Sequence, residues 1–426
     1  MRKLWSDWDL NQWLSIIESR NTQEIQLGLT RIREVAQKLS LLNPECKVIT
    51  VTGTNGKGST VAALETLYHT AGYQVGTYTS PHLIRFNERI RLNRCPVSDD
   101  AICLAFRYIE EARGDIVLTY FEMATLAALW LFHQHPLDIM ILEVGIGGRL
   151  DATNIIDADL AIITTVALDH QDYLGESLEA IAFEKAGIMR EGNPFIYGDL
   201  HPPATIAEAA NRLEIKGYYY GQDYSFNEYA EHWEIKGIGL SQTLPKPQIQ
   251  LKSAAMAILA TTLFHSILPI SQEQLALAMQ KIFIPGRLQW VKGNVEVLYD
   301  VSHNPQSAEL LAATLKKRDQ KTTVHGVFSA LKDKDLLGII SPLKDCIDHW
   351  YPAQLDTKRA TSSTDLLAKF QDAEIFLDVC YTSPLVAFET ALEQANLGDL
   401  IVVFGSFYTV GQVMAAQHNL FEQETQ

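Results

Sequence analysis

The sequence predicts an α/β protein: a larger domain with a mostly parallel sheet and a phosphate-binding loop, then a smaller C-terminal α/β domain. Two observations carry this prediction. Residues 48–52 form a β-branched apolar run of the kind found in buried parallel strands, and a glycine-rich turn and a helical pattern follow it. Strand and helix patterns then alternate along most of the chain, which favours open sheets covered by helices.

The turn after this first strand reads G-T-N-G-K-G-S-T over residues 53–60. Its glycines let backbone N–H groups approach an anion, and a helix opening near Ser59 adds positive charge at its N-terminus. Lys57 supplies a full charge for the β- and γ-phosphates of a nucleotide, and the Ser59 hydroxyl can bind magnesium. A glycine-rich turn without a ligand is the alternative, and the agreement of strand, glycines, lysine and hydroxyl argues against it.

The composition is that of an ordinary globular protein of two or three domains, with 426 residues, 47% hydrophobic and 20% charged. The formal net charge of −16 argues against nonspecific nucleic-acid binding and gives no reason to expect attraction to anionic lipid. Five scattered cysteines without a C-x-x-C pair fit reduced thiols. Because the N-terminus has no apolar leader and no apolar run reaches membrane-spanning length, we expect a cytoplasmic protein.

Polar side chains recur where the predicted strands end. Ser80 follows a strand at 74–79, Glu143 ends a strand at 138–143, and His170 follows a strand at 160–166. Ligands of open α/β sheets bind outside the carboxyl ends of the strands, so we expect these side chains near the phosphate loop. A carboxylate that leaves a buried strand beside several glycines is typical of a metal ligand, and we expect Glu143 to bind magnesium.

Other segments leave alternatives open. The run I-R-F-N-E-R-I-R-L at 84–92 is either an exposed, charged hairpin or a mobile basic lid near anions. Phe121 either offers an aromatic face to a flat ligand or is a core residue that opens an apolar helix. The remaining patterns indicate a strand at 194–197, a small antiparallel sheet within 217–251, and helices at 5–20, 25–41, 99–113, 120–135, 253–268 and 272–281.

The C-terminal part of the chain predicts a second, smaller open sheet. Strand patterns at 295–305, 322–329, 348–351, 374–379 and 399–407 are separated by helical patterns. This part carries no phosphate loop, so it does not repeat the first site. We place the boundary between the two domains at residues 290 and 291, which gives a larger domain at 1–290 and a smaller one at 291–426.

A linked set of motifs carries a family resemblance over nearly the whole chain. The set is G-T-N-G-K-G-S, T-S-P-H-L, L-E-V-G-x-G-G-R-L-D-A-T-N, L-D-H, E-K-A-G-I, P-G-R and D-x-x-H-N-P. It resembles the bacterial bifunctional dihydrofolate synthase/folylpolyglutamate synthase family of the Mur ligase superfamily. The resemblance implies a central domain like that of the Mur ligases and a Rossmann-like C-terminal domain.

The resemblance also implies roles for individual residues. Lys57, His170 and Lys185 are catalytic, and Lys185 is carbamylated to support the metal site. Metal ligands are Ser59, Ser80, Glu143 and His170. ATP contacts come from Thr54, Asn55, Gly56, Lys57, Gly58, Ser59, Arg287 and Asp300. Folate contacts come from Leu27, Gly28, Thr119, Tyr120, Phe121, Glu122, Leu150, Asp151 and Ala152, and glutamate contacts from His303 and Ser406. Two family positions differ: Gln26 stands where bacterial members often have Asp, and Leu251 and Lys252 stand near a usual Asn.

The implied activity is ATP-dependent addition of L-glutamate to dihydropteroate and to reduced folates through an acyl phosphate, releasing ADP and phosphate. Mg²⁺ is the expected cofactor, with room for a monovalent cation, and a monomer without nucleic-acid or membrane partners is expected. Alternatives are a folylpolyglutamate synthase alone, another Mur-type amino-acid ligase, or a P-loop switch protein without ligase activity. Only 52 residues precede Gly53, too few for the nucleotide-sugar-binding domain of a peptidoglycan ligase.

Overall fold

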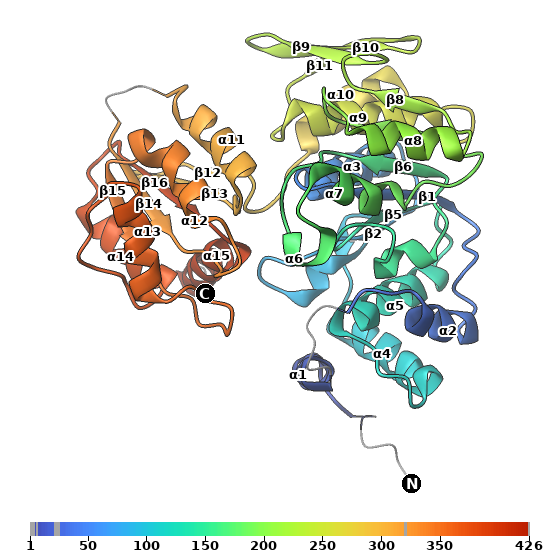
Figure 1. The fold of residues 1–426 in the computed structure, drawn as a ribbon, viewed down its shortest axis with the longest axis horizontal. Helices are drawn as coiled ribbons and strands as arrows, with labels where there is room; N and C mark the ends of the chain where they lie inside the picture. The colour runs from blue at the N-terminus through green and yellow to red at the C-terminus, as the bar shows by residue number, and fades with distance from the viewer. Residues whose placement is uncertain (1–4, 6, 21–25, 319–321, 425–426) are drawn as a thin grey trace. The chain divides into compact units, whose positions relative to one another are not determined.

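The structure, a computed structural model, describes residues 5, 7–20, 26–318 and 322–424. The chain divides into two compact units, coloured in sequence order in Figure 1. Unit 1 contains Met1–His82 and Phe86–Phe283, and unit 2 contains Leu83–Arg85 and Ile284–Gln426. No helix in the described ranges is long and apolar enough to cross a membrane.

Unit 1 is built on an eight-stranded sheet in the order β4-β3-β2-β5-β1-β6-β7-β8. Its strands are β1 (Lys47–Thr52), β2 (Val75–Tyr78), β3 (Ile90–Leu92), β4 (Cys95–Pro96), β5 (Ile139–Glu143), β6 (Leu160–Ile163), β7 (Phe195–Tyr197) and β8 (Gly217–Tyr219). The six strands from β2 to β8 in this order are parallel, whereas β3 and β4 continue antiparallel at one edge. The parallel strands are almost wholly buried, as their β-branched apolar sequences predict.

Helices cover both faces of this sheet. Unit 1 contains α1 (Leu10–Arg20), α2 (Thr30–Lys38), α3 (Lys57–Thr70), α4 (Asp99–Arg113), α5 (Tyr120–His133), α6 (Gln171–Leu174), α7 (Leu178–Ala186), α8 (Ala204–Arg212), α9 (Leu251–Leu263) and α10 (Gln272–Lys281), with short 3-10 turns η1 (Phe86–Arg89) and η2 (Ala152–Ile155). On one face α5, α7 and α8 pack on side chains of β5 and β6, while α3 packs with α9 and α10. The start of the second predicted helix, at residue 25, lies outside the described residues; α2 itself begins at Thr30.

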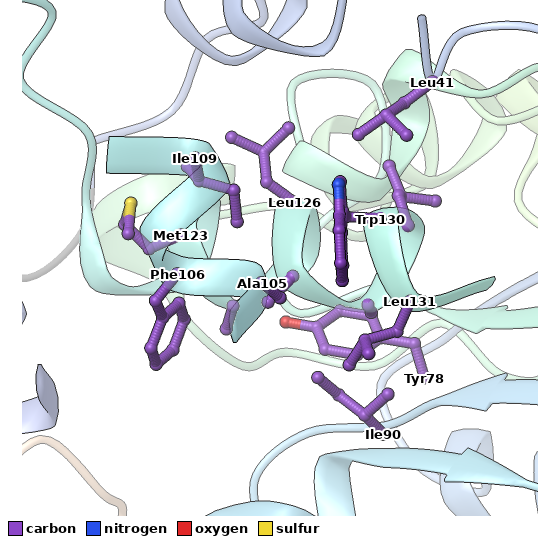
Figure 2. Close-up of a cluster of buried hydrophobic side chains, with 14 of the residues drawn as sticks. Leu41, Tyr78, Ile90, Ala105, Phe106, Ile109, Met123, Leu126, Trp130 and Leu131 are labelled. Atoms are coloured by element: carbon purple, nitrogen blue, oxygen red, sulfur yellow. The ribbon is translucent and has the colours of Figure 1, made fainter. Parts of the chain in front are cut away.

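The largest apolar cluster of unit 1 joins α1, α2, α4 and α5 to the sheet. Figure 2 shows side chains of α4 and α5, among them Phe106 and Trp130, gathered in one cluster with Tyr78 of β2. Trp13 of α1 is fully buried against Phe106 and anchors the first helix in this core. Truncating such a buried aromatic side chain to alanine costs about 3–5 kcal/mol of folding free energy.

The arginine-rich segment is largely buried, so the reading of it as an exposed hairpin is wrong. Phe86, Asn87, Arg89 and Ile90 are all buried. The Asn87 amide donates 2.8 Å hydrogen bonds to the Val97 carbonyl and to Asp99, which ties η1 to the segment between β4 and α4. The charge pattern of this segment did not reveal these contacts because they involve residues further along the chain.

The range 217–251 divides between two sheets. β8 pairs in parallel with β7 and so extends the main sheet. The following strands β9 (Ser225–Glu228), β10 (His232–Gly237) and β11 (Leu240–Pro245) form a separate antiparallel sheet. In Figure 1 this small sheet lies at the end of unit 1 opposite to α1 and α4.

Unit 2 is built on a five-stranded sheet in the order β12-β13-β16-β14-β15, parallel except for β12. Its elements are β12 (Gln289–Val291), β13 (Glu296–Asp300), α11 (Pro305–Leu315), β14 (Val324–Phe328), α12 (Leu336–Ile340), η3 (Ser341–Cys346), β15 (His349–Pro352), α13 (Ser363–Asp372), α14 (Pro384–Gln394), β16 (Leu400–Phe404) and α15 (Phe407–Glu424). Helices α11, α12 and α13 pack on one face, and α14 and α15 on the other. The predicted α/β fold class is confirmed.

The strand predicted at 374–379 is wrong, because these residues form a loop after α13. Ile375 and Leu377 pack against the core while Phe376 between them is 79% exposed, so the segment has the alternation of a strand. Glu374 turns the chain at the start of this segment with a φ of +59°, and the chain pairs beside the end of β15 only later, through a single bridge between Tyr381 and Ala353.

Candidate active site

The phosphate loop joins β1 to α3 and is tied to two threonines that follow β6. Residue 53 must be glycine, because a Cβ there would lie 1.8 Å from Oγ1 of Thr164 and because its φ is +152°. The N–H of Asn55 donates a 3.0 Å hydrogen bond to Oγ1 of Thr165, and the hydroxyls of Thr164 and Thr165 both donate to the Asn55 carbonyl. These bonds fix the backbone of the loop.

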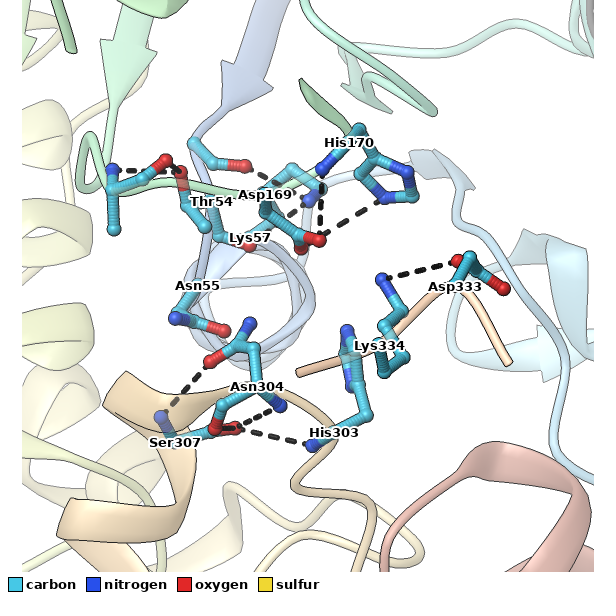
Figure 3. A network of polar contacts seen from close by, with 12 residues as sticks. Thr54, Asn55, Lys57, Asp169, His170, His303, Asn304, Ser307, Asp333 and Lys334 are labelled. Atoms are coloured by element: carbon cyan, nitrogen blue, oxygen red, sulfur yellow. Dashed lines mark hydrogen bonds and ion pairs between the residues drawn. The ribbon is translucent and has the colours of Figure 1, made fainter. Parts of the chain in front are cut away.

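Lys57 places its ammonium group over this loop. The side chain begins at the first residue of α3, and Nζ donates to the carbonyls of Gly53 at 2.9 Å and Thr54 at 3.4 Å. Thr54 is itself tied to the chain after β6 by two hydrogen bonds with the backbone of Ala167 (Figure 3). A lysine charge at the N-terminus of a 14-residue helix makes a binding site for phosphate.

The carboxylate of Glu143 lies against the same loop. Glu143 ends β5, which is paired with β1, and it is 5% exposed. A Cβ on Gly58 would lie 3.7 Å from Oε2 of Glu143, and the backbone N–H of Ser80 donates to that oxygen at 3.3 Å. The structure therefore brings together Glu143, Ser80 and the first turn of α3, where Ser59 lies.

His170 follows β6 in a left-handed backbone conformation, with a φ of +52° that is uncommon for a residue other than glycine. Its N–H donates to Oδ1 of Asp169 at 3.0 Å, and its Nε2 lies 3.8 Å from Oδ2 of the same carboxylate. Figure 3 shows Asp169 beside both His170 and Lys57. The role of His170 as a metal ligand stays a prediction.

Lys185 is a buried lysine on α7, with 3% of its surface exposed. Burial, and then the charge of Lys57, lower the pKa of its amine to about 7, while Asp169 and Asp151 act in the opposite direction. A substantial fraction of this amine is therefore uncharged near neutral pH. An uncharged amine is the form that can add carbon dioxide.

The predicted folate residues converge around the N-terminus of α5. The N–H of Gly28 donates a 3.2 Å hydrogen bond to the carbonyl of Leu150. Thr119 and Glu122 form a reciprocal capping box at the start of α5, and Arg31 lies 3.1 Å from the Glu122 carboxylate. Segments that are far apart in the sequence thus meet at one place, and Leu27 is half-buried beside Gly28.

In this region Phe121 packs its ring against Gly145, whereas Asp151 is a buried carboxyl group. The ring of Phe121 lies under Gly145, where a Cβ would be 2.6 Å from the ring, and 5.9 Å from the ring of Tyr78. Asp151 is buried and accepts hydrogen bonds from Ile146 and Thr153, and burial raises the pKa of its carboxyl. Ala152, which follows it, is also buried.

The predicted residues of unit 2 share one edge of its own sheet. Asp300 ends β13 and Ser406 follows the neighbouring strand β16. The Asp300 carboxylate accepts hydrogen bonds from the N–H groups of Leu288 at 2.8 Å and Ser302 at 3.0 Å. The Ser406 hydroxyl lies 2.6 Å from that of Thr409 in the first turn of α15.

Two further residues of unit 2 lie beside Phe407. The Arg287 guanidinium is 5.3 Å from the centre of the Phe407 ring, and the His303 ring is 6.1 Å from it. Figure 3 shows His303 next to Asn304 and Ser307, which form a capping box at the start of α11. Arg287 and His303 are therefore brought together within unit 2.

The sequence alone missed several residues of the site. Thr164 and Thr165 hold the phosphate loop, and their place at the end of the predicted strand 160–166 is the available signal. Arg89 lies under the ring of Tyr120, at 5.5 Å, and its Nε–H donates to Nδ1 of His82. Burial, and then the charge of Arg89, lower the pKa of His82 to about 4, so its ring is neutral.

Leu251 and Lys252, at the start of α9, stand where members of the family usually have an asparagine. Lys252 forms a 3.0 Å ion pair with Asp199, which follows β7, and lies 5.7 Å from the ring of Tyr220. Ser253, the next residue on α9, is buried, and its Oγ would lie 3.4 Å from a Cβ on Gly56. Ser253 therefore places a hydroxyl next to the phosphate loop.

Two known protein families match parts of this chain. The Mur ligase middle domain matches residues 51–243, and the glutamate ligase domain of the Mur ligases matches residues 286–407. The dihydrofolate synthase/folylpolyglutamate synthase of Escherichia coli (strain K12) is 41% identical over 406 residues, covering 95% of this chain and 94% of that protein. The chain belongs to the dihydrofolate synthase/folylpolyglutamate synthase family.

Solved structures of this family have the same fold. E. coli FolC in complex with DHPP and ADP matches with a TM-score of 0.93 at 40% identity, covering 97% of this chain and 98% of that one. A bifunctional folylpolyglutamate synthase/dihydrofolate synthase with Mn, AMPPNP and L-glutamate bound matches with a TM-score of 0.90, at the same identity and coverage. The predicted family is confirmed.

Proposed function

We propose that the protein is an ATP-dependent ligase that adds L-glutamate to dihydropteroate, forming dihydrofolate, and to reduced folates, lengthening their glutamate chain. Family membership supports this activity, and one observation carries it: the carboxylate of Glu143 lies against the phosphate loop, beside Gly58 and Ser80. Phosphoryl transfer requires such oxygen donors for a metal ion next to the nucleotide phosphates. The ADP, AMPPNP, glutamate and DHPP bound by relatives correspond to the proposed substrates.

The reaction has two steps. A carboxylate oxygen of the folate substrate attacks the γ-phosphorus of ATP, ADP leaves, and an acyl phosphate forms. The uncharged amine of L-glutamate then attacks the acyl carbon, phosphate leaves, and the nitrogen loses a proton to give the amide. Neither step needs a nucleophilic side chain, so the protein acts by positioning the reactants and stabilising negative charge.

The predicted residues divide between these tasks. Lys57 and the N-terminus of α3 neutralise the phosphates, with the loop residues 54–59 as the phosphate contacts. In unit 2, Arg287 and Asp300 contact the nucleotide, and His303 and Ser406 bind the incoming glutamate. The residues around Phe121, Asp151 and Gly28 bind the pterin part of the folate.

We assign the divalent cation as magnesium. The candidate donors on Glu143, Ser80 and Ser59 are oxygen atoms, which suit a hard cation, with His170 as a further ligand. No group of three or more His, Cys, Asp and Glu residues in the described part of the chain could hold a metal ion. Phosphate oxygens and water would therefore complete the coordination, and the bound ion would neutralise charge on the transferring phosphoryl group.

Lys185 is proposed to be carbamylated. Its burial and its pKa of about 7 favour the uncharged amine that reacts with carbon dioxide. Carbamylation would replace a buried cation by an anion near Lys57, removing the repulsion between the two lysines.

We further propose that residues 1–290 bind ATP and folate and that residues 291–426 act as the glutamate-ligase domain. A monomer suffices, because residues of one chain fill every role assigned above. No partner other than small-molecule substrates is needed for the reaction.

A coupled assay of ADP release tests the proposed function. Release should require both L-glutamate and either dihydropteroate or a tetrahydrofolate, and mass spectrometry should detect the matching glutamylated product. ATP hydrolysis that responds to neither substrate would indicate a P-loop switch protein. Activity with tetrahydrofolate alone would indicate a folylpolyglutamate synthase without dihydrofolate synthase activity.

A further inference from the structure

Arg89 is a buried arginine without a carboxylate partner. It is 8% exposed, and no Asp or Glu lies within ion-pair distance of it among the described residues. Arg91, two residues along the chain, is by contrast fully paired, with Nε and Nη2 lying 3.0 Å and 2.9 Å from the Glu65 carboxylate. A guanidinium does not lose its proton in proteins, so the buried charge of Arg89 calls for an anion from outside the protein.

The guanidinium of Arg89 is fixed in place by three side chains. Its Nε–H donates a 2.8 Å hydrogen bond to Nδ1 of His82. Its central carbon lies 5.7 Å from the ring centre of Phe86 and 5.5 Å from that of Tyr120. The two terminal nitrogens have no hydrogen-bond partner in the described ranges, and both still reach solvent. That pair of nitrogens can bind one carboxylate through two parallel hydrogen bonds.

Arg89 also lies close to both parts of the site in unit 1. Its carbonyl accepts a 2.9 Å hydrogen bond from the N–H of Thr79, the residue before Ser80. The Tyr120 ring beside its guanidinium belongs to the residue before Phe121. One contact of Arg89 is therefore next to the candidate metal ligands, and another is next to the aromatic ring of the folate region.

Building on the proposed ligase function, we propose that Arg89 binds the α-carboxylate of a glutamate already attached to a reduced folate. Dihydropteroate has one carboxylate, which reacts and must face the γ-phosphate of ATP. A folylglutamate reacts through the γ-carboxylate of its glutamate and also carries an α-carboxylate that does not react. A fixed cation near the reacting centre suits this second carboxylate. Arg89 is then a specificity-determining residue for chain extension.

Binding measurements with a matched ligand pair test this assignment. Isothermal titration calorimetry would compare tetrahydropteroylglutamate with its α-amide, which lacks only the α-carboxylate charge. The wild-type protein should bind the amide about 10- to 100-fold more weakly, because a hydrogen-bonded charge pair is lost. Arg89→Gln should bind acid and amide equally, with dihydropteroate affinity unchanged, and Arg89→Lys should retain part of the preference.

A control variant and the wild-type comparison distinguish failure of the Arg89 assignment from failure of the proposed function. Arg94→Gln removes another arginine near Arg89, whose guanidinium donates a 3.2 Å hydrogen bond to the Lys281 carbonyl, and should behave as wild type. Equal loss of dihydropteroate and folate binding in Arg89→Gln would overturn the assignment. If Arg89→Gln does not fold, the wild-type comparison decides alone, since equal affinity for acid and amide overturns it. A wild-type protein that glutamylates neither substrate would instead refute the proposed function.

Discussion

The backbone N–H of Ser80 donates a 3.3 Å hydrogen bond to Oε2 of Glu143. Ser80 follows β2 and Glu143 ends β5, and these strands are neighbours in the sheet. The same carboxylate faces Gly58 at the start of α3. The ends of three parallel strands thus meet at one carboxylate, which is the metal ligand that we propose.

Replacing Glu143 by glutamine should raise the magnesium requirement. The change keeps the size of the side chain and its hydrogen bond from Ser80 but removes the charge that attracts a hard cation. We expect the magnesium concentration for half-maximal ADP release to rise on the order of 10- to 100-fold. Glu34→Gln, an exposed carboxylate on α2, is the control. An unchanged magnesium dependence would make Glu143 a structural residue.

Lys57→Ala should abolish ligation while the fold stays intact. Removing a cation that stabilises charge on the transferring phosphoryl group costs on the order of 3 kcal/mol or more in the barrier, a rate loss above about 100-fold. Steady-state kinetics would measure the loss, with a thermal melt to confirm folding. Lys38→Ala, at an exposed lysine, should leave both unchanged. Near-normal turnover of Lys57→Ala would rule out the phosphate-loop assignment.

Carbamylation of Lys185 predicts a dependence on bicarbonate and pH. The folded protein lowers the pKa of this amine to about 7, so the uncharged, reactive fraction grows as the pH rises through 7. Protein depleted of carbon dioxide should lose activity and regain it with bicarbonate, faster at pH 8 than at pH 6. Intact-mass spectrometry should detect one added CO₂ group.

A variant provides the control for that experiment. Lys185→Ala should be inactive and should regain activity when a short carboxylic acid occupies the space of the carbamate. Lys57→Ala should gain nothing from the same acid, because it lacks a different group. Full activity of Lys185→Ala without any acid would contradict the carbamate.

The convergence of the strand-end residues could be predicted from the sequence. A β-branched run followed by glycines identifies the central strand, and parallel strands place the loops after their carboxyl ends at one edge of the sheet. That reasoning identifies Ser80 and Glu143, and the structure gives the hydrogen bond between them.

The environment of Arg89 could not be predicted in this way. An arginine-rich run has the composition of a solvated hairpin. The residues that contact this run lie further along the chain: the Tyr120 ring lies beside Arg89, and Asp99 accepts a hydrogen bond from Asn87. The loop at 374–379 failed for a related reason. Its side chains alternate like those of a strand, but they form no ladder along the free edge of β15, and no local pattern reveals whether a segment pairs with a sheet.

Phe121→Ala should separate the two proposed activities. Dihydropteroate and a reduced folate share a pterin and a benzoyl unit but differ in where the reacting carboxylate lies. One enzyme can serve both only if the pterin occupies two positions or two overlapping sites share one phosphoryl centre. The half-buried ring of Phe121 lies against Gly145 and offers its remaining surface to a flat pterin in one of these positions.

We therefore expect Phe121→Ala to reduce dihydropteroate ligation far more than extension of a tetrahydrofolate glutamate chain. Phe121→Tyr, which keeps the ring, should preserve both activities. The measurement is kcat/KM for each substrate at saturating ATP and glutamate, with a thermal melt to account for the packing lost next to Gly145. Equal losses in both reactions would indicate that the two folates share one binding position, since a single aromatic contact would then serve each of them.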